Sequence, residues 1–322
     1  MGNVLIDKNS GKELHKGKYN LKRKMAKIWK DKSFYLILLP GIIYFVLFHY
    51  VPMYGATIAF KDFKVMQGIL GSKWVGFKNF IELFNHPSFW PVVRNSLIIS
   101  LYKVFWGFPA PIILALLLNE LRKESFKRTI QTISYLPHFL SWVVIGGLAV
   151  KMLSPSTGVV NLIIKALGFK PIYFMVNPKY FRSVLVLTDI WHGIGWGSII
   201  YLAALSGVDP QLYEAATVDG ASRWRQIWSI TIPSISSTIA IMLILRMGGI
   251  MNAGFEQIFV MYSPNVYDVA DIIDTFNYRL GFENAQYSLA TAIGLFKSVI
   301  GFTLILITNK LSKLIDEGNG IW

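Results

Sequence analysis

The chain has 322 residues, of which 53% are hydrophobic and 15% aromatic, and its mean hydropathy is +0.46. Soluble domains rarely reach this hydropathy over such a length, so we expect an integral membrane protein. The chain contains no cysteine, which excludes disulfides and cysteine metal sites.

The net charge of +14 is unevenly distributed along the chain. The N-terminal arm, residues 1–34, holds ten lysines and arginines against three acidic residues. Nucleic-acid binding is one interpretation of such an arm. A basic cytosolic flank that orients the first membrane span and touches anionic lipid is the interpretation we favour, because positive flanks are usual beside first spans. We therefore expect no nucleic-acid partner.

Beyond the arm the sequence predicts one membrane domain, residues 35–311, and a short cytosolic tail, residues 312–322. A membrane-spanning helix needs about 20 largely apolar residues, and six stretches meet this requirement. They are 35–59, 91 or 95 to 118, 130–153, 183–205, 234–260 and 289–311. With the arm in the cytosol, six spans return the C-terminus to the cytosol as well. The prediction is an all-α protein with six transmembrane helices.

A polar segment between the fourth and fifth spans, residues 209–233, is called the elbow below. Asp209 is suited to cap a helix and Pro210 to occupy its first turn. Gly220 can end that helix, because glycine adopts the left-handed conformation at low cost. A second short helix is expected over 221–230, before Pro233 at the end of the elbow.

The elbow resembles the EAA loop of ABC-importer permeases. The residues that carry the spacing are Glu214, Ala215, Ala216, Gly220, Ile230, Ile232 and Pro233. Ile232 stands where the family usually has leucine, and Asp219-Gly220-Ala221 is similar to the version found in sugar importers. Segment 75–80 resembles a segment of carbohydrate permeases. Segments 254–259 and 267–271 are similar to LplB-like polysaccharide permeases, a subgroup that includes importers of uronate-rich oligosaccharides.

The resemblance implies a type I importer permease fold and a bacterial cytoplasmic membrane location. It implies that the elbow docks on an ATPase subunit through Glu214, Ala215, Ala216, Asp219, Gly220 and Ala221. The implied partners are a second homologous permease, two ATPase subunits, an extracellular solute-binding protein and an oligosaccharide. ATP and Mg²⁺ would then be bound by the ATPase subunits, and this chain would carry no cofactor. The alternative for the elbow is an ordinary loop helix, whose alanines merely favour helix.

Polar residues inside predicted spans point to a transport path, because charges in a membrane helix are costly and usually face a cavity or a partner. The candidates for substrate contact are Lys103, Asp189, Trp191, Arg246, Asn252, Glu256 and Lys297. Three of these candidates are cationic, namely Lys103, Arg246 and Lys297, and they suggest a transport path suited to acidic sugars. The alternative is that these charges form interhelical ion pairs, for example Asp189 with a basic neighbour. Aromatic residues in the same spans, Trp196 among them, could stack on sugar rings or simply pack.

No catalytic residues are expected in this chain. It has no Gly-x-x-x-x-Gly-Lys-Ser/Thr phosphate loop and no His-Glu-x-x-His metal motif, and its five histidines are scattered. We therefore predict a permease subunit of an ATP-driven importer for oligosaccharides or polysaccharide fragments. A membrane enzyme acting on lipid-linked sugars would need an acidic or nucleophilic cluster at one membrane face. An ATP-independent transporter often shows related halves, which are not visible here.

Overall fold

In a computed structural model the protein is described from residue 31 to residue 315, with side chains described to residue 310. The chain divides into two compact units, residues 1–57 and 58–322. Most of the predicted N-terminal arm and the tail beyond residue 315 lie outside the described residues.

The described part of the first unit is helical. α2 (Lys32–Phe45), η1 (Val46–Tyr50) and α3 (Val51–Met53) follow one another without a break, and η2 (Tyr54–Phe60) continues the helix into the second unit. The whole segment, Lys32–Phe60, is 29 residues long and apolar enough to cross a membrane. It contains the predicted first span.

The described part of the second unit contains helices and one short antiparallel pair, in which β1 (Lys61–Asp62) pairs with β2 (Lys73–Trp74). Its first elements, in chain order, are η3 (Val65–Gln67), α4 (Gly68–Gly71), α5 (Lys78–Asn85), α6 (Phe89–Tyr102), η4 (Lys103–Gly107), α7 (Pro109–Asn119), α8 (Glu124–Tyr135), η5 (Leu136–Phe139), α9 (Trp142–Leu153), α10 (Val159–Ala166) and α11 (Pro178–Ser206). The elements that follow are α12 (Pro210–Val218), α13 (Arg223–Gln226), η6 (Ile227–Thr231), α14 (Ile232–Ser234), α15 (Ser236–Gly248), α16 (Phe255–Met261), η7 (Pro264–Val266), α17 (Tyr267–Ala270), α18 (Ile273–Tyr278), η8 (Arg279–Glu283) and α19 (Tyr287–Ile315).

Six candidate membrane crossings can be counted in the described residues. Four are continuous: Lys32–Phe60, Phe89–Asn119, Pro178–Ser206 and Tyr287–Lys310. The other two are helix pairs that qualify only if each bent pair is one span. Each of these six segments overlaps one of the six predicted spans, and two of them are bent pairs of helices.

The third predicted span, residues 130–153, is broken in its middle. The helices before and after the break, Glu124–Phe139 and Trp142–Leu153, are bent by 105°. Pro137 lacks a backbone donor and lies in the last turn of the first segment. Ser141 then caps the second helix, and its hydroxyl oxygen accepts a hydrogen bond from the Val144 N–H at 3.4 Å.

The fifth predicted span, residues 234–260, ends earlier than expected. α15 stops at Gly248, and residues 249–254 are not helical. A Cβ atom added to Gly248 would lie 2.8 Å from the Ile305 side chain, so glycine permits the close approach of α15 to α19. Gly254, with φ +96°, then begins α16 in a conformation that other residues rarely adopt.

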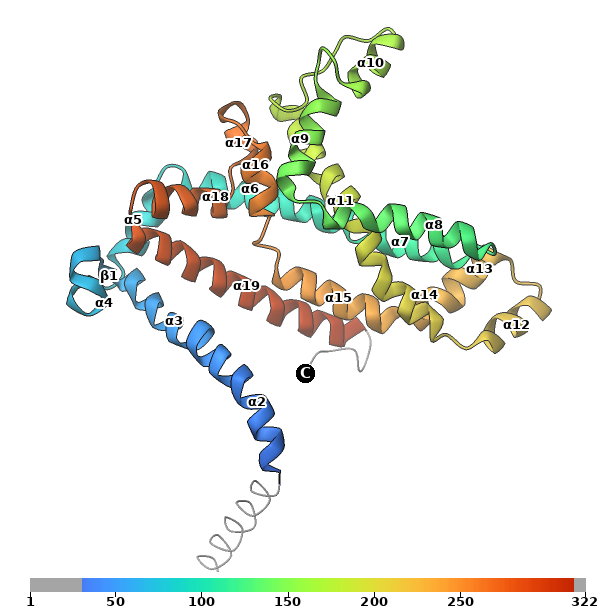
Figure 1. Cartoon of the computed structure of the whole chain (residues 1–322), viewed down its shortest axis with the longest axis horizontal. Coiled ribbons are helices and arrows are strands. Elements are labelled where there is room, and N and C mark those ends of the chain that lie inside the picture. Colours follow the sequence, from blue (N-terminus) through green and yellow to red (C-terminus); the bar gives the residue numbers. More distant parts are fainter. Residues whose placement is uncertain (1–30, 316–322) are drawn as a thin grey trace, which may run out of the picture. The chain divides into compact units, whose positions relative to one another are not determined.

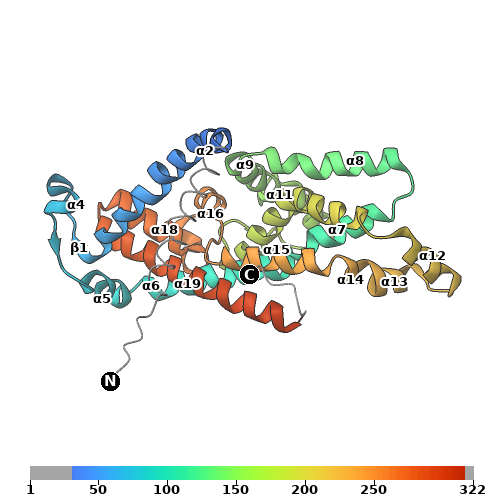
Figure 2. The ribbon, with the colours of Figure 1, turned by 90° about the horizontal axis from the view of Figure 1, so that it is seen from below.

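Helix α11 packs against both α7 and α8 (Figures 1 and 2). Two glycines make this possible. A Cβ added to Gly195 would lie 2.0 Å from the Ser134 carbonyl oxygen on α8, and one added to Gly197 would lie 3.0 Å from Pro111 on α7. Small residues allow membrane helices to approach closely in this way. A buried apolar cluster of Ala115, Tyr201, Leu205 and Ile235 joins these helices to α15.

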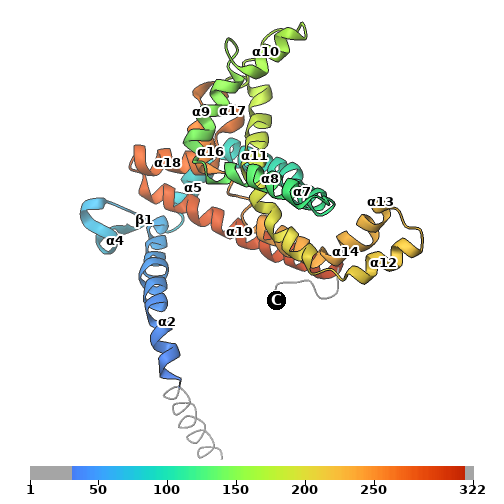
Figure 3. The same cartoon turned by 45° about the vertical axis from the view of Figure 1, so that its right-hand side comes forward.

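The elbow extends beyond the ends of α11 and α15, as the loop of α12 and α13 in Figure 3. It therefore connects two long helices of the membrane domain directly. Any force on the elbow acts on α11 at one end and on α15 at the other.

We expect Gly195→Ala to destabilise the protein by about 1–3 kcal/mol, because the added methyl group collides with the α8 backbone. The measurement is the midpoint of thermal unfolding of the purified chain in detergent. Gly147→Ala on α9 is the matched control, since a Cβ there would meet no atom within 4 Å. Equal midpoints for the two variants would contradict the close crossing of α8 and α11.

Candidate functional site

The first elbow helix has the N-cap and the C-terminal glycine that the sequence predicts, whereas the cap of the second was not predicted. The Asp209 carboxylate accepts a hydrogen bond from the Gln211 N–H at 2.9 Å, and Pro210 begins α12. Gly220 follows the helix in the left-handed conformation, with φ +74°. Ser222 caps α13 by accepting a hydrogen bond from the Arg225 N–H at 3.4 Å.

The second elbow helix differs from its prediction. It begins at Arg223 and continues through Pro233 to Ser234, instead of ending before the proline. A π-turn, η6, ends at Thr231, two residues before Pro233. The wider turn accommodates the proline, whose ring and missing N–H disturb a regular α-helix.

Side-chain hydrogen bonds hold the two arms of the elbow together. Gln226 is buried, and its amide donates to the Thr217 hydroxyl at 3.0 Å and to the Ala221 carbonyl at 3.4 Å. The Tyr213 and Thr231 hydroxyls lie 3.1 Å apart. The sequence analysis missed Gln226. The sequence carries no signal for it, because the burial of its amide is visible only in the structure.

The elbow has a groove and several exposed residues. A groove of about 320 Å³ is lined by Ala216, Asp219, Ala221, Arg225, Gln226, Ser229 and Ile230. Of the six predicted coupling residues, Ala216, Asp219 and Ala221 line this groove. The other three, Glu214, Ala215 and Gly220, are exposed to solvent. All six are therefore accessible or half-buried, as a docking surface requires.

A second cluster lies where α11 meets η4 and the break before α16. Lys103 begins the π-turn η4, and its side chain is buried. Its ammonium group lies 3.1 Å from the Asp189 carboxylate and donates to the Ala253 carbonyl at 2.9 Å. It also donates to the Gln257 side-chain oxygen. Lys103 is thus fully engaged within the protein, as the ion-pair alternative proposes.

Gln257 is a residue of this cluster that sequence analysis did not single out. Its side chain is fully buried and donates to the Leu185 carbonyl at 2.7 Å and to the Thr188 hydroxyl at 2.8 Å. A Cβ on Gly254 would lie 2.7 Å from the Lys103 ammonium nitrogen, so only glycine leaves room for that nitrogen. These contacts fix the non-helical segment before α16 to α11.

Asp189 is shared between two cations. One carboxylate oxygen contacts Lys103, and the other accepts a hydrogen bond from Arg246 at 3.5 Å. The Arg246 side chain is 47% exposed, whereas that of Lys103 is 5% exposed. Arg246 lies in the last turn of α15 rather than in the middle of a span. Its guanidinium group is therefore accessible in a way that the Lys103 ammonium group is not.

Two cavities meet at Arg246. One, of about 350 Å³, lies between α7, α11 and α15 and includes Asp189, Gly193 and Gly197 in its lining. The other, of about 260 Å³, is lined by Ser100, Lys103, Arg246 and Asn252 among others. Asn252 is exposed in the loop after α15. The structure therefore brings Lys103, Asp189, Arg246 and Asn252 together around these two cavities.

The remaining substrate candidates lie elsewhere. Lys297 pairs with Asp274 at 2.5 Å, and Glu256 is exposed on α16, outside the shortened fifth span. Trp191 lines an apolar cavity of about 530 Å³ between α9 and α11. Residues two apart on a helix point about 200° apart, so Trp191 does not lie beside Asp189.

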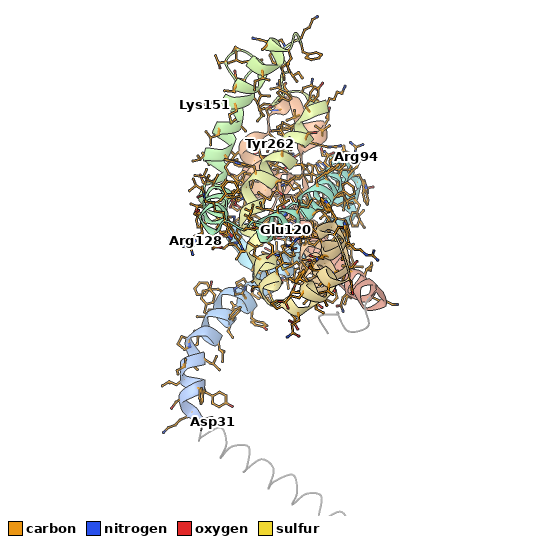
Figure 4. The ribbon with its side chains drawn as sticks, turned by 90° about the vertical axis from the view of Figure 1, so that its right-hand side faces the viewer. Asp31, Arg94, Glu120, Arg128, Lys151 and Tyr262 are labelled. Atoms are coloured by element: carbon orange, nitrogen blue, oxygen red, sulfur yellow. The ribbon has the colours of Figure 1, made fainter. Side chains whose placement is uncertain are left out.

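A polar network missed by sequence analysis holds the segment around α17 and α18. The Arg279 guanidinium group donates two hydrogen bonds to Asp271, at 2.9 and 2.5 Å, and lies 5.3 Å from the centre of the Tyr267 ring. The contact with Asp271 raises the pKa of Arg279. Burial raises the pKa of Tyr262, labelled in Figure 4, to about 12, so its phenol is protonated at neutral pH.

Metal binding has no evident site in the described part of the chain. Between residues 31 and 315 no three His, Cys, Asp or Glu side chains come close enough together to hold a metal ion.

Comparison with known proteins gives a consistent result. Residues 107–317 match the family described as "Binding-protein-dependent transport system inner membrane component". The chain is 45% identical to the polygalacturonan/rhamnogalacturonan transport system permease protein YteP of Bacillus subtilis (strain 168), over 92% of each chain. It is 46% identical to protein LplB of the same organism, over 91% of this chain and 92% of that protein.

Solved structures agree with these relatives. The fold is similar to a chain of a bacterial ABC transporter involved in the import of the acidic polysaccharide alginate, with a TM-score of 0.85 and 42% identity. That match covers 91% of this chain and 99% of the other. A bacterial alginate ABC transporter in complex with an alginate pentasaccharide-bound periplasmic protein matches with a TM-score of 0.84. The likeness confirms the all-α, six-span permease fold.

We expect Arg279→Gln to destabilise the protein by roughly 3–5 kcal/mol, because it leaves the buried Asp271 carboxylate without its ion-pair partner. Arg128→Gln on α8 is the matched control. Its pair with Glu124 is exposed at both side chains (76% and 65%), so its loss should cost less than about 1 kcal/mol. Thermal unfolding of both variants in detergent measures the difference. Similar midpoints would show that the Asp271 pair does not stabilise this region.

Proposed function

The chain belongs to the family of binding-protein-dependent transport system inner membrane components, and we propose that it is the permease subunit of an ATP-driven importer for acidic oligosaccharides. The observation that carries the proposal is the pair formed by Asp189 and Arg246. It joins α11 to α15, the two helices that flank the elbow, and it lies beside the two cavities that meet at Arg246. The pair therefore links the elbow, which is the proposed docking surface for an ATPase subunit, to the cavities proposed as the path of the solute.

An acidic substrate fits the charges of this path. The Arg246 guanidinium group is accessible and is held by a single carboxylate at 3.5 Å. Arginine binds carboxylates through two parallel hydrogen bonds, so a uronate could replace or share the contact with Asp189. The names of the relatives support this assignment, since they refer to polygalacturonan, rhamnogalacturonan and alginate.

The elbow would receive the force of ATP hydrolysis. We assign ATP and Mg²⁺ to partner ATPase subunits, because this chain has no phosphate loop. The groove with Ala216 and Asp219 and the exposed Glu214 would form the docking surface. Small side chains allow close approach, and Glu214 can pair with a cation on the ATPase. Movement of the elbow would change the separation of α11 and α15, and hence the contact between Asp189 and Arg246.

The complete importer would contain a second, homologous permease, two ATPase subunits and an extracellular solute-binding protein. The solved alginate transporter was captured with a sugar-bound periplasmic protein, which supports the last of these partners. We place both termini of this chain in the cytosol. This orientation puts the elbow on the side of the membrane where ATP is present.

We expect the double variant Glu214→Arg, Gly220→Asp to lose its ATPase subunits. The charge reversal removes the anionic contact, and aspartate strains a position with φ +74°. The measurement is co-purification of the ATPase with the chain extracted from membranes. The variant must still elute as a folded protein.

The matched control carries the same two changes far from the elbow. Glu82→Arg with Gly168→Asp alters an exposed glutamate on α5 and a glycine with φ +84°. This control should keep its ATPase. Retention of the ATPase by both double variants would show that the elbow is an ordinary loop.

We expect Arg246→Gln to reduce uptake of uronate oligosaccharides about tenfold or more relative to neutral ones, because a charge-assisted pair is lost. Uptake is measured in vesicles that contain the complete importer, with both substrates present in competition. Arg128→Gln, which removes an exposed arginine from α8, should leave the ratio unchanged. An unchanged ratio of uronate to neutral uptake in Arg246→Gln would contradict the assignment of an acidic substrate.

A further inference from the structure

One face of α11 carries several residues that take no part in the ion pairs of Asp189 with Lys103 and Arg246. His192, Gly193 and Trp196 follow Asp189 at spacings of three, four and seven residues, so all four lie on the same side of the helix. A Cβ added to Gly193 would meet no atom within 4 Å. The space beside Gly193 is therefore open, and Gly193 lines the cavity of about 350 Å³ together with Asp189.

A stack of rings supports the Trp196 end of this face. The His138 ring lies parallel to the Trp196 indole, with centroids 4.6 Å apart and an interplanar angle of 7°. His138 also contacts His192 at 5.2 Å, and Trp142 contacts His192 at 4.5 Å. His138 comes from η5, at the break in the third span, so the break brings this ring onto α11. One face of the Trp196 indole is covered, and the side chain is still 48% exposed.

Polar groups on this face argue against contact with lipid. Asp189 and His192 share it, and ionisable side chains in membrane segments normally face a cavity or a partner. Asp189 is paired with Lys103 and Arg246, and the Arg246 side chain stays accessible beside it. The hydroxyl or carboxylate groups of a sugar could bond to accessible polar groups on this face, whereas a lipid tail could not.

We propose that Trp196 is a stacking surface for a pyranose ring of the transported oligosaccharide, with His138 as its rigid support. The ring lies over Gly193, and the carboxylate of a neighbouring uronate reaches Arg246 beside Asp189. Apolar C–H faces of sugars pack on indoles, while their hydroxyls bond to nearby polar groups. This assignment rests on the proposed function and adds the residues that recognise the ring.

The spacing along α11 sets the length of the recognised unit. Asp189 and Trp196 are seven residues apart, which is about 10 Å along the helix axis at 1.5 Å per residue. One pyranose ring cannot reach both ends of this distance. The site therefore recognises at least two linked sugars, one through its ring and the next through its carboxylate.

Trp196→Ala tests the proposal, with Trp191→Ala as a matched control. Both indoles lie on α11 and are about half exposed, at 48% and 45%, but they point to opposite sides. The assay uses vesicles with the complete importer, and the probes are galacturonate and alginate oligosaccharides of one, two and three residues. Wild type should take up the two- and three-residue probes of at least one series in preference to the monosaccharide.

Trp196→Ala should raise the KM for those probes about tenfold, because a ring contact and its burial are lost together. Trp191→Ala should change the KM less than about twofold, since its indole lies in an apolar cavity. Trp196→Phe should recover most of the uptake, because it keeps an aromatic face. Co-purification of the second permease should be the same for all variants.

The outcomes separate this inference from the proposed function. If the wild-type importer takes up neither series of acidic probes, the proposed substrate class is wrong, and the stacking site for it is wrong as well. If wild type transports them but the two alanine variants behave alike, only the stacking site is wrong. Loss of the second permease from Trp196→Ala alone would show that this face is a contact between permeases instead.

Discussion

The buried ammonium group of Lys103 is the contact on which the geometry of the membrane domain depends. A charge removed from water is tolerated only when it is paired and hydrogen-bonded. Here Asp189 supplies the countercharge, and the Ala253 carbonyl and Gln257 supply further acceptors. These partners come from α11, from the chain break after α15 and from α16. One cation therefore fixes three segments, including a stretch of non-helical backbone that could not face lipid alone.

Asp189 gives this rigid centre a second role. Its other oxygen reaches the accessible Arg246, so the same carboxylate belongs both to the buried scaffold and to the wall of a cavity. The two helices that carry Asp189 and Arg246 are also those that enter and leave the elbow. A signal from the ATPase side and a negatively charged solute would thus act on one ion pair, without any intermediate network of residues.

Much of this arrangement could be predicted from the sequence. Hydropathy located six apolar segments, and the local chemistry of Asp209 and Gly220 predicted the first elbow helix. Hydropathy could not predict the breaks near Ser141 and Gly248, because apolar content is the same in straight and bent helices. Periodicity alone could have placed Trp196, rather than Trp191, on the side of Asp189. The stacking of His138 on Trp196 depends on a bend between distant segments, so no local pattern indicates it.

The π-turn at Lys103–Gly107 has a consequence for how this protein can vary in length. Such a turn holds one residue more than an α-turn, and it normally persists only where that residue is needed. Deleting one residue there would restore a regular α-helix and remove the wider turn that Lys103 begins. The ammonium group of Lys103 would then lose the backbone geometry that places it against Asp189. Insertions and deletions should therefore be tolerated in the loops of this chain but not within this turn.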